Sequence, residues 1–153
     1  MRISTKGRYA LHIMVDLAQN QKDGYVALKD ISERQGISMK YLEMIAGLLN
    51  KAGLIVSARG RDGGYKLSKK PEEYTVASIL KAAEGSLSPV SCLDTPENRC
   101  PQADLCITLP LWEELDRRID EYLESVTVAD LISQNRQRGG PAPFSAKKGQ
   151  IIK

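Results

Sequence analysis

Two short amphipathic segments joined by a tight glycine turn constrain the fold of this chain more than any other feature. The first segment, Leu28–Gln35, is predicted to be a helix that ends at Gly36. Ser38 suits the N-cap of the next helix, because its side-chain oxygen can accept an unpaired backbone amide. That helix is expected over Met39–Lys51, with apolar side chains along one face. Such a pair is typical of a helix-turn-helix, although a small helical bundle can also contain it.

A predicted β-hairpin follows the second of these helices directly. Residues 54–58 and 65–68 are expected to be strands, and the sequence RGRDGG lies between them. Glycines supply the positive φ angles that a tight hairpin needs. The spacing of these glycines matches no nucleotide-binding motif, and the run precedes a strand instead of a helix, which argues against a phosphate-binding loop. We therefore interpret the hairpin as the wing of a winged helix-turn-helix.

The side chains that this motif can present to DNA lie near the start of its second helix and at the wing tip. Helix-turn-helix proteins contact base edges with the N-terminal part of the second helix. Ser38, Lys40 and Tyr41 occupy that part, on or beside the face opposite the apolar one. Arg59 and Arg61 can lie along phosphates or enter a minor groove. We predict that these residues contact double-stranded DNA.

Charge is unevenly distributed along the chain. Residues 1–75 hold 13 Lys and Arg against 8 Asp and Glu, whereas residues 76–134 hold 4 against 11. Residues 135–153 hold 5 basic residues and no acidic one. This segregation favours an N-terminal part that faces a polyanion. No apolar run reaches membrane-spanning length and the N-terminus has no signal-peptide core, so we expect a cytoplasmic protein with no membrane partner.

A long, highly charged helix is predicted from about Thr108, which can cap it, with Pro110 in its first turn. A narrow apolar stripe runs along this helix: Leu111, Leu115, Ile119, Tyr122 and Val126. A stripe this narrow on so charged a helix favours pairing with a second copy in a homodimer over packing on its own domain. Thr127 and Asp130 predict a capping box for a last helix that ends near Ser133.

Apolar periodicity predicts two further helices, over residues 4–19 and 76–84. The expected fold is therefore mainly α with a small β-wing. We expect a winged-helix DNA-binding domain over residues 1–85, a loop over 86–107, and a dimerisation helix with a short terminal helix over 108–134. Residues 135–153 are predicted to be a disordered basic tail.

All three cysteines of the chain lie in that loop, at Cys92, Cys100 and Cys106. Clustered cysteines in a reducing cytosol more often bind metal or do redox chemistry than form structural disulfides. Thiolates suit iron–sulfur clusters, zinc and copper(I). Structural zinc sites favour close C-x₂-C pairs, which this loop lacks, so the wider spacing favours a cluster. A thiol-based redox switch without a metal stays open.

Three thiolates leave one ligand position of a cluster unfilled. Asp94, Glu97 and Asp104 lie within the loop, His12 is the single histidine of the chain, and Glu43 lies on the second helix of the motif. A packed or surface histidine explains His12 equally simply, and water or a weak oxygen ligand can also complete such a site. We retain His12 and Glu43 as candidates and leave the fourth ligand open.

Three strings carry a resemblance to a known family: MRISTKGRYAL at the N-terminus, ISMKYLEMI in the second motif helix, and RGRDGGYKL in the wing. Over roughly residues 1–134 the sequence resembles the IscR family of bacterial winged-helix regulators, which also includes NsrR, RirA and CymR. The resemblance implies a dimer with crossing long helices, a near-palindromic operator, and a cluster-binding loop before each long helix. The implied cluster is 2Fe–2S as in IscR, with 4Fe–4S, as in some NsrR proteins, the alternative.

The cysteine loop departs from the pattern of that family. IscR-type loops separate their cysteines by five and five residues, whereas this loop has seven and five. They also carry a histidine three residues after the third cysteine, where this chain has Leu109. NsrR uses a carboxylate near the start of the first helix of the partner subunit, and Arg8 occupies the matching position here.

The resemblance implies a repressor that senses iron–sulfur cluster status and controls cluster-assembly genes. A nitric-oxide or thiol-redox sensing repressor is one alternative. A CymR-like regulator that is controlled by a partner enzyme and holds no cofactor is another, although it does not need three loop cysteines. An enzyme is not expected, because the sequence offers no nucleophile–base pair, and no small-molecule substrate is predicted.

Overall fold

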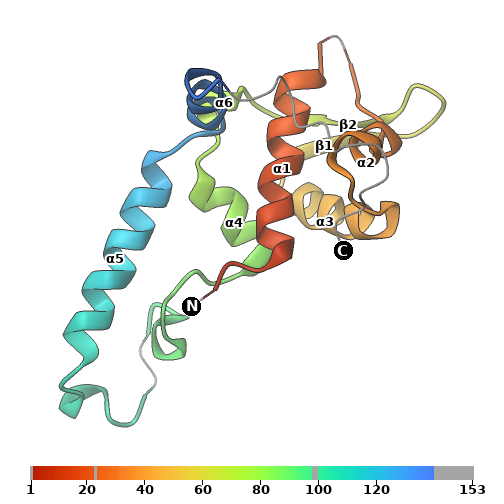
Figure 1. The fold of residues 1–153 in the computed structure, drawn as a ribbon. Coiled ribbons are helices and arrows are strands. Elements are labelled where there is room, and N and C mark those ends of the chain that lie inside the picture. Colours follow the sequence, from red (N-terminus) through yellow and green to blue (C-terminus); the bar gives the residue numbers. More distant parts are fainter. Residues whose placement is uncertain (1, 23, 98–99, 140–153) are drawn as a thin grey trace.

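The computed structural model describes residues 2–22, 24–97 and 100–139 (Figure 1). Its helices and strands are, in chain order, α1 (Thr5–Asn20), α2 (Leu28–Gln35), α3 (Met39–Lys51), β1 (Ile55–Ala58), β2 (Gly64–Leu67), α4 (Val76–Glu84), α5 (Leu109–Ser125) and α6 (Val128–Gln137). Single 3₁₀ turns lie at η1 (Pro71–Glu73), η2 (Ser91–Leu93) and η3 (Ala103–Leu105). The prediction of a mainly α, winged helix-turn-helix fold is confirmed.

The helix-turn-helix forms as its sequence predicts. Gly36 ends α2 in the left-handed conformation, with φ of 66°, and its amide donates to the Ser32 carbonyl. The Ser38 side chain caps α3 by accepting the amide of Tyr41 at 3.3 Å. Local capping chemistry therefore fixes both ends of the turn.

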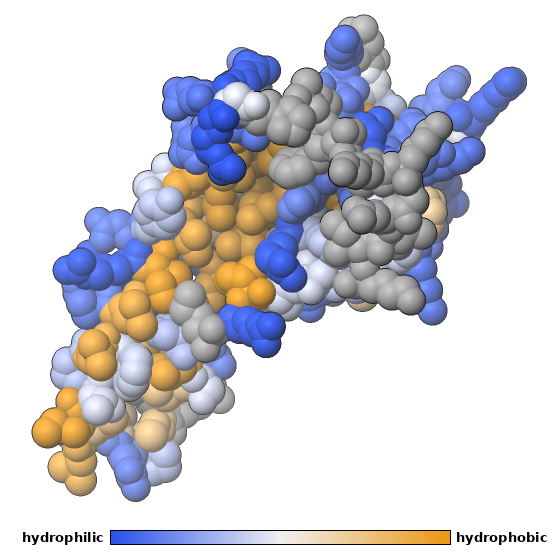
Figure 2. Space-filling view, in the orientation of Figure 1, coloured by the Kyte–Doolittle hydropathy of each residue, from blue (hydrophilic) through white to orange (hydrophobic). Residues whose placement is uncertain are grey.

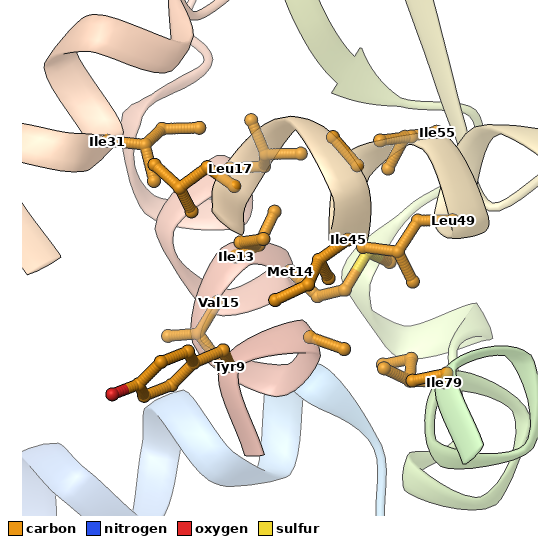
Figure 3. Packing of buried hydrophobic residues seen from close by; sticks show 14 of the residues in the cluster. Tyr9, Ile13, Met14, Val15, Leu17, Ile31, Ile45, Leu49, Ile55 and Ile79 are labelled. Atoms are coloured by element: carbon orange, nitrogen blue, oxygen red, sulfur yellow. The ribbon is translucent and has the colours of Figure 1, made fainter. Parts of the chain in front are cut away.

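The core is built around α1, which lies between α2 and α3 on one side and α4 on the other (Figure 1). Figure 3 shows Ile13 and Met14 of α1 beside Ile45 and Leu49 of α3. These four side chains are completely inaccessible to solvent. Each such burial stabilises the fold by about 1.5–3 kcal/mol before entropy is counted. Val128 of α6 belongs to the same buried cluster, so the C-terminal helix completes the core.

The wing is held to the body by backbone and side-chain contacts. β1 and β2 pair antiparallel, with Ile55 opposite Leu67. Val26 and Tyr65 exchange two backbone hydrogen bonds of 2.8 and 2.9 Å, which adds a third segment to the hairpin. The buried Tyr74 hydroxyl donates to the Leu54 carbonyl at 2.7 Å and accepts the Ser68 amide at 2.9 Å, so the base of the hairpin is fixed.

Helix α5 leaves the body, and its C-terminal half packs on α4 (Figure 1). There Leu123 and Val126 contact the cluster formed by Val76, Leu80 and Leu87 of α4 and the segment after it. Lys81 of α4 also forms a 2.6 Å ion pair with Asp120. One member of the predicted stripe, Val126, is thus used within its own chain.

Two predictions about helix ends are wrong. Thr108 makes no side-chain capping bond to α5, although Pro110 does lie in the first turn. Helix α6 starts at the predicted Thr127–Asp130 capping box but continues beyond Ser133 to Gln137, and it packs on α1 and η1. The predicted disordered tail thus begins within a helix, and its residues 140–153 lie outside the described part of the chain. Among the described residues, no helix is long and apolar enough to cross a membrane.

Candidate nucleic-acid interface and cysteine loop

The N-terminal end of α3 presents an exposed surface of mixed chemistry. Lys40 is exposed, and the hydroxyl oxygen of Ser38 already accepts the Tyr41 amide. The Tyr41 ring is half-buried and meets the Tyr9 ring edge-on, with centroids 5.6 Å apart. Met39, which the sequence reasoning did not single out, is 40% exposed at the first position of the helix. In the sequence, Met39 is an apolar residue that lies outside the inward-facing apolar stripe of this helix.

A buried polar network fixes α2, and hence the turn before α3, against α1. Asp16 is fully buried and accepts two hydrogen bonds from Arg34, at 2.7 and 3.0 Å. Gln35 donates a third bond to Asp16 at 2.9 Å. The Asp16 carboxylate raises the pKa of Arg34 above its ordinary value, chiefly through these hydrogen bonds. An acidic residue inside the apolar stripe of a helix is the sequence signal for this network, which the predictions above do not include.

The wing tip presents its two arginines to solvent. Arg59 and Arg61 are both exposed. Gly60, with φ of 107°, lies between them, and its carbonyl accepts the Gly63 amide at 3.1 Å. A side chain at Gly63 would collide with the Ala58 carbonyl oxygen. The glycines therefore permit a turn tight enough to hold both arginines at the extreme end of the hairpin.

The three cysteines are spread along the loop between α4 and α5. Cys92 lies in η2, and Cys106 follows η3 three residues before α5 begins. Within the described residues, no group of three or more His, Cys, Asp or Glu side chains converges as a metal site. The thiols suit an iron–sulfur cluster by donor chemistry.

The surroundings of Cys106 favour the thiolate form of its side chain. Its sulfur lies 3.4 Å from the Thr108 hydroxyl oxygen. This hydroxyl, followed by the backbone amides of Thr108 and Leu109, lowers the pKa of Cys106 below its ordinary value. Thr108, predicted to cap α5, instead contacts Cys106 and accepts the Trp112 indole N–H at 3.3 Å. A lower pKa favours the thiolate, which is both the metal-binding and the nucleophilic form.

The candidate fourth ligands lie on the winged head. His12 Nδ1 is 3.2 Å from Gln35 Oε1, so one ring nitrogen is engaged by the helix that precedes the turn. Glu43 is exposed on α3. Neither residue forms a metal-ligand group with the cysteines in the described chain. Their role as ligands stays a prediction.

A carboxylate joins the beginning of the cysteine loop to the N-terminus of α1. Glu84, the last residue of α4, accepts the backbone amides of Ser4 at 2.8 Å and Gly7 at 3.1 Å, and the Ser4 hydroxyl at 2.5 Å. A Cβ atom at Gly7 would overlap the Glu84 carboxylate. The negative charge thus lies at the positive end of the α1 dipole. No local sequence signal predicts a contact across 80 positions.

The outer face of α5 carries exposed apolar side chains. Leu111 is 59% exposed and Tyr122 is 65% exposed. In Figure 2 an apolar band follows α5 and continues onto the body between α5 and α1. The charged face of the helix holds ion pairs, and hydrogen bonds from Arg117 and then Arg118 lower the pKa of Glu114 to about 2. Single apolar residues are common on protein surfaces, whereas a continuous apolar band like this one is typical of an interaction site.

Comparisons with known proteins agree with this architecture. A family model described as "Rrf2: Iron-dependent Transcriptional regulator" matches residues 3–134. The HTH-type transcriptional regulator IscR of Aliivibrio salmonicida is 40% identical over 135 residues, which cover 88% of this chain and 79% of that protein. The structure of T. potens IscR has a TM-score of 0.72 and 37% identity, with 93% of each chain covered. CymR, the global cysteine regulator of B. subtilis, has a TM-score of 0.70 and 36% identity, covering 88% of this chain and 98% of that one.

These matches span nearly all of the described chain and include the wing, the cysteine loop and the long helix. The prediction that the chain is not an enzyme is confirmed, because its relatives are named as transcriptional regulators. The chain belongs to the Rrf2 family of DNA-binding transcriptional regulators, with relatives of the IscR type.

Proposed function

We propose that this chain is a homodimeric, cytoplasmic repressor whose DNA binding depends on an iron–sulfur cluster held by Cys92, Cys100 and Cys106. The observation that carries the proposal is the position of the loop. It holds every cysteine of the chain and joins the winged head to α5, the helix with the exposed apolar stripe. A change in this loop can therefore alter the spacing of two DNA-binding heads.

The DNA-binding step uses the exposed side chains of the head. Lys40 and Ser38 at the start of α3 meet bases or phosphates in a major groove, and Tyr41 lies beside them. Arg59 and Arg61 of the wing lie along phosphates or in the neighbouring minor groove. The fixed attachment of α2 to α1 by Asp16 supports this role, since it orients α3 before DNA arrives. Two heads related by a two-fold axis fit a near-palindromic operator.

The sensing step uses the loop thiols. Cys92, Cys100 and Cys106 would hold the cluster, which would supply a redox-active iron centre. Cys106 is prepared for binding by the Thr108 hydroxyl, which favours its thiolate. Incomplete protein ligation suits a sensor, because it leaves the centre easy to lose. By resemblance to IscR, the operators lie before cluster-assembly genes and the cluster is 2Fe–2S, with 4Fe–4S the alternative.

The transmission step uses the two ends of the loop. One end is fixed to α1 through Glu84, and the other begins the helix that pairs two subunits. Drawing the cysteines together moves these ends relative to each other. A difference of a few kcal/mol between the two loop arrangements is enough to change DNA affinity about 100-fold.

Anaerobic purification tests the sensing step. The protein is expected to be coloured and to contain iron and acid-labile sulfide, and Cys92→Ala, Cys100→Ala and Cys106→Ala are each expected to bleach it. Ser91→Ala, beside Cys92 in the same turn, is the matched control and should keep the colour. Stoichiometric zinc without iron or sulfide would overturn the cluster and leave the DNA-binding proposal standing.

A regulator without a cofactor is the second candidate. One observation favours it: the similarity to CymR, the global cysteine regulator of B. subtilis. A colourless protein whose operator affinity is the same in the wild type and the Cys→Ala variants would support this candidate against the first. A thiol-redox switch would differ from both, since oxidant would then change DNA affinity without any iron.

A further inference from the structure

The outward-facing side of α3 carries an exposed methionine. Met44 is 46% exposed, whereas its neighbour Ile45 and, one turn later, Leu49 are completely buried against the body of the protein (Figure 3). Burial of those two side chains fixes the rotation of α3 about its axis, so Met44 is held on the outer side. A single exposed apolar residue is ordinary on a protein surface, and it is the position of Met44 along the helix that distinguishes it.

Met44 belongs to a row of exposed residues that follows the axis of α3. Lys40, Met44, Gly47 and Lys51 are spaced by four, three and four positions, which places them one above another on the helix. All four are exposed, and we call them the outer row. Its two ends are cationic, and its middle holds an apolar side chain beside a glycine. This composition matches a DNA major groove, where phosphates form the walls and base edges form the floor.

Gly47 lies inside α3 without a packing reason in the described part of the chain. An added Cβ atom there has nothing within 4 Å. Glycine is less favourable than alanine inside a helix, and one of its uses is to let the backbone approach a ligand closely. Helical side chains lean toward the N-terminus, so a side chain at position 47 would cover the surface next to Met44. The glycine therefore keeps the space beside Met44 open.

The chemistry of Met44 selects one kind of base edge. Its thioether is apolar and only a weak hydrogen-bond acceptor, so it cannot replace the strong donors and acceptors that guanine, adenine and cytosine edges require. The C5-methyl group of thymine is the apolar group that base edges present in the major groove. An unbranched, polarizable side chain adapts well to such a contact.

We infer that Met44 contacts the C5-methyl group of a thymine in each half-site of the operator, and that Gly47 leaves room for that base edge. The inference rests on the proposed entry of α3 into the major groove, and it adds a specificity-determining residue to that step. Lys40 and Lys51, at the two ends of the outer row, meet phosphates on either side. The apolar contact then discriminates between bases, whereas the two cations supply affinity for any sequence.

Removal of a single methyl group from the DNA tests this contact. Preferred sequences are first selected from a pool of random duplexes with anaerobically purified, full-length protein. Each thymine of the selected half-site is then replaced in turn by deoxyuridine, in both half-sites, which removes the methyl group and keeps the base pairing. At one position the replacement should weaken binding by the wild type about 10-fold, because a methyl group loses its apolar partner at two sites. Fluorescence anisotropy measures both affinities.

Three variants assign the methyl contact to Met44. Met44→Ala should bind the thymine and uracil duplexes equally. Lys40→Ala, the matched control one turn away on the outer row, should bind both duplexes more weakly and keep the 10-fold ratio. Gly47→Ala should weaken binding several-fold although it stabilises the fold, a pair of effects that structural damage cannot produce. Circular-dichroism melts establish that each variant is folded.

The outcomes separate this inference from the proposal on which it rests. A wild type that selects no common sequence, or a Lys40→Ala variant with unchanged affinity, would remove the entry of α3 into the major groove. A Lys40-dependent interaction in which no thymine responds to loss of its methyl group would overturn the reading by Met44 and leave the DNA-binding step intact. A thymine-to-uracil ratio that stays the same in Met44→Ala as in the wild type would do so as well.

Discussion

Several single residues in this structure serve two elements at once. Ser38 caps α3 and stands among the predicted DNA contacts. Thr108 receives the Trp112 indole N–H and contacts the Cys106 sulfur. Glu84 ends α4 and satisfies amides at the start of α1. Substitutions at such positions therefore affect stability and function through different contacts, and the measurements below separate them.

Thr108→Val removes the hydroxyl that chiefly lowers the pKa of Cys106. The reactive species in alkylation is the thiolate, so this change should slow iodoacetamide labelling of Cys106 several-fold near neutral pH. The rate profile should also shift to higher pH, because a less stabilised thiolate forms at higher pH. Peptide mass spectrometry of the cluster-free protein reads this out, and the labelling rate of Cys92 in the same sample is the internal control. Equal Cys106 profiles for the variant and the wild type would contradict the role of Thr108.

Glu84→Ala should destabilise the chain by about 1–2 kcal/mol, because the first turn of α1 loses its carboxylate acceptor. Gly7→Ala should destabilise it as well, since the added methyl group overlaps the same carboxylate. In the Glu84→Ala background the second change should become nearly harmless, so the two effects are not additive. Urea denaturation measures all of these free energies of unfolding.

Gly47→Ala is the control for that series. Gly47 lies inside α3 with nothing within 4 Å of an added Cβ atom. Replacing a helical glycine with alanine there should stabilise the chain by about 0.5–1 kcal/mol. Destabilisation of similar size at Gly7 and Gly47 would mean that the contact with Glu84 does not matter.

At the scale of elements, the sequence was most informative where the signals are local. The bounds of α2, α3 and α4 agree with prediction, because N-cap residues, terminal glycines and apolar spacing all act within a few positions. β1 begins one residue later than predicted and β2 lies one residue earlier, as is usual at element ends. The packing of Leu123 on α4, the extension of α6 to Gln137 and the contact of Glu84 with Ser4 depend on residues far apart in sequence. Neither periodicity nor capping chemistry contains that information.

The wing gives a prediction that belongs to the hairpin as a unit. Arg59→Ala and Arg61→Ala should each weaken DNA binding and reduce the slope of log affinity against log salt by about 1, because each removes one phosphate contact. Fluorescence anisotropy over a salt series measures the slope. Arg118→Ala, an exposed α5 arginine that pairs with Glu114, should leave the slope unchanged. A wild-type slope in both wing variants would remove the wing from the interface.

At the scale of the whole molecule, the protein joins a basic head, a cysteine-bearing loop and a charged helix with an exposed apolar stripe. The cysteines illustrate what a single sequence can and cannot predict. Their types and spacing indicate thiolate chemistry, whereas their positions in the folded chain depend on the path that the loop takes from α4 to α5 (Figure 1). Local sequence patterns likewise do not identify the fourth ligand of a cluster, because that ligand can come from any surface that reaches the loop.

Leu115→Glu should turn the proposed dimer into a monomer, because it puts two charges into the middle of the α5 stripe. Affinity for a complete operator should then fall by at least about 100-fold, since the second head no longer binds as part of the same molecule. Affinity for a single half-site should stay as in the wild type, which shows that the head is still folded. Light scattering and anisotropy on both DNA lengths check this. A monomer that retains full-operator affinity would contradict the two-headed arrangement.

The burial of Val128 in the main apolar cluster, on a helix that packs against α1, has a consequence for how the protein is made. A chain still emerging from a ribosome has its helix-turn-helix and wing in sequence long before it has α6. Its central core nevertheless lacks a buried side chain until the last described helix has been synthesised. The head therefore reaches its final stability only after the loop and α5 are also present, so that completion of folding and competence to pair coincide in time.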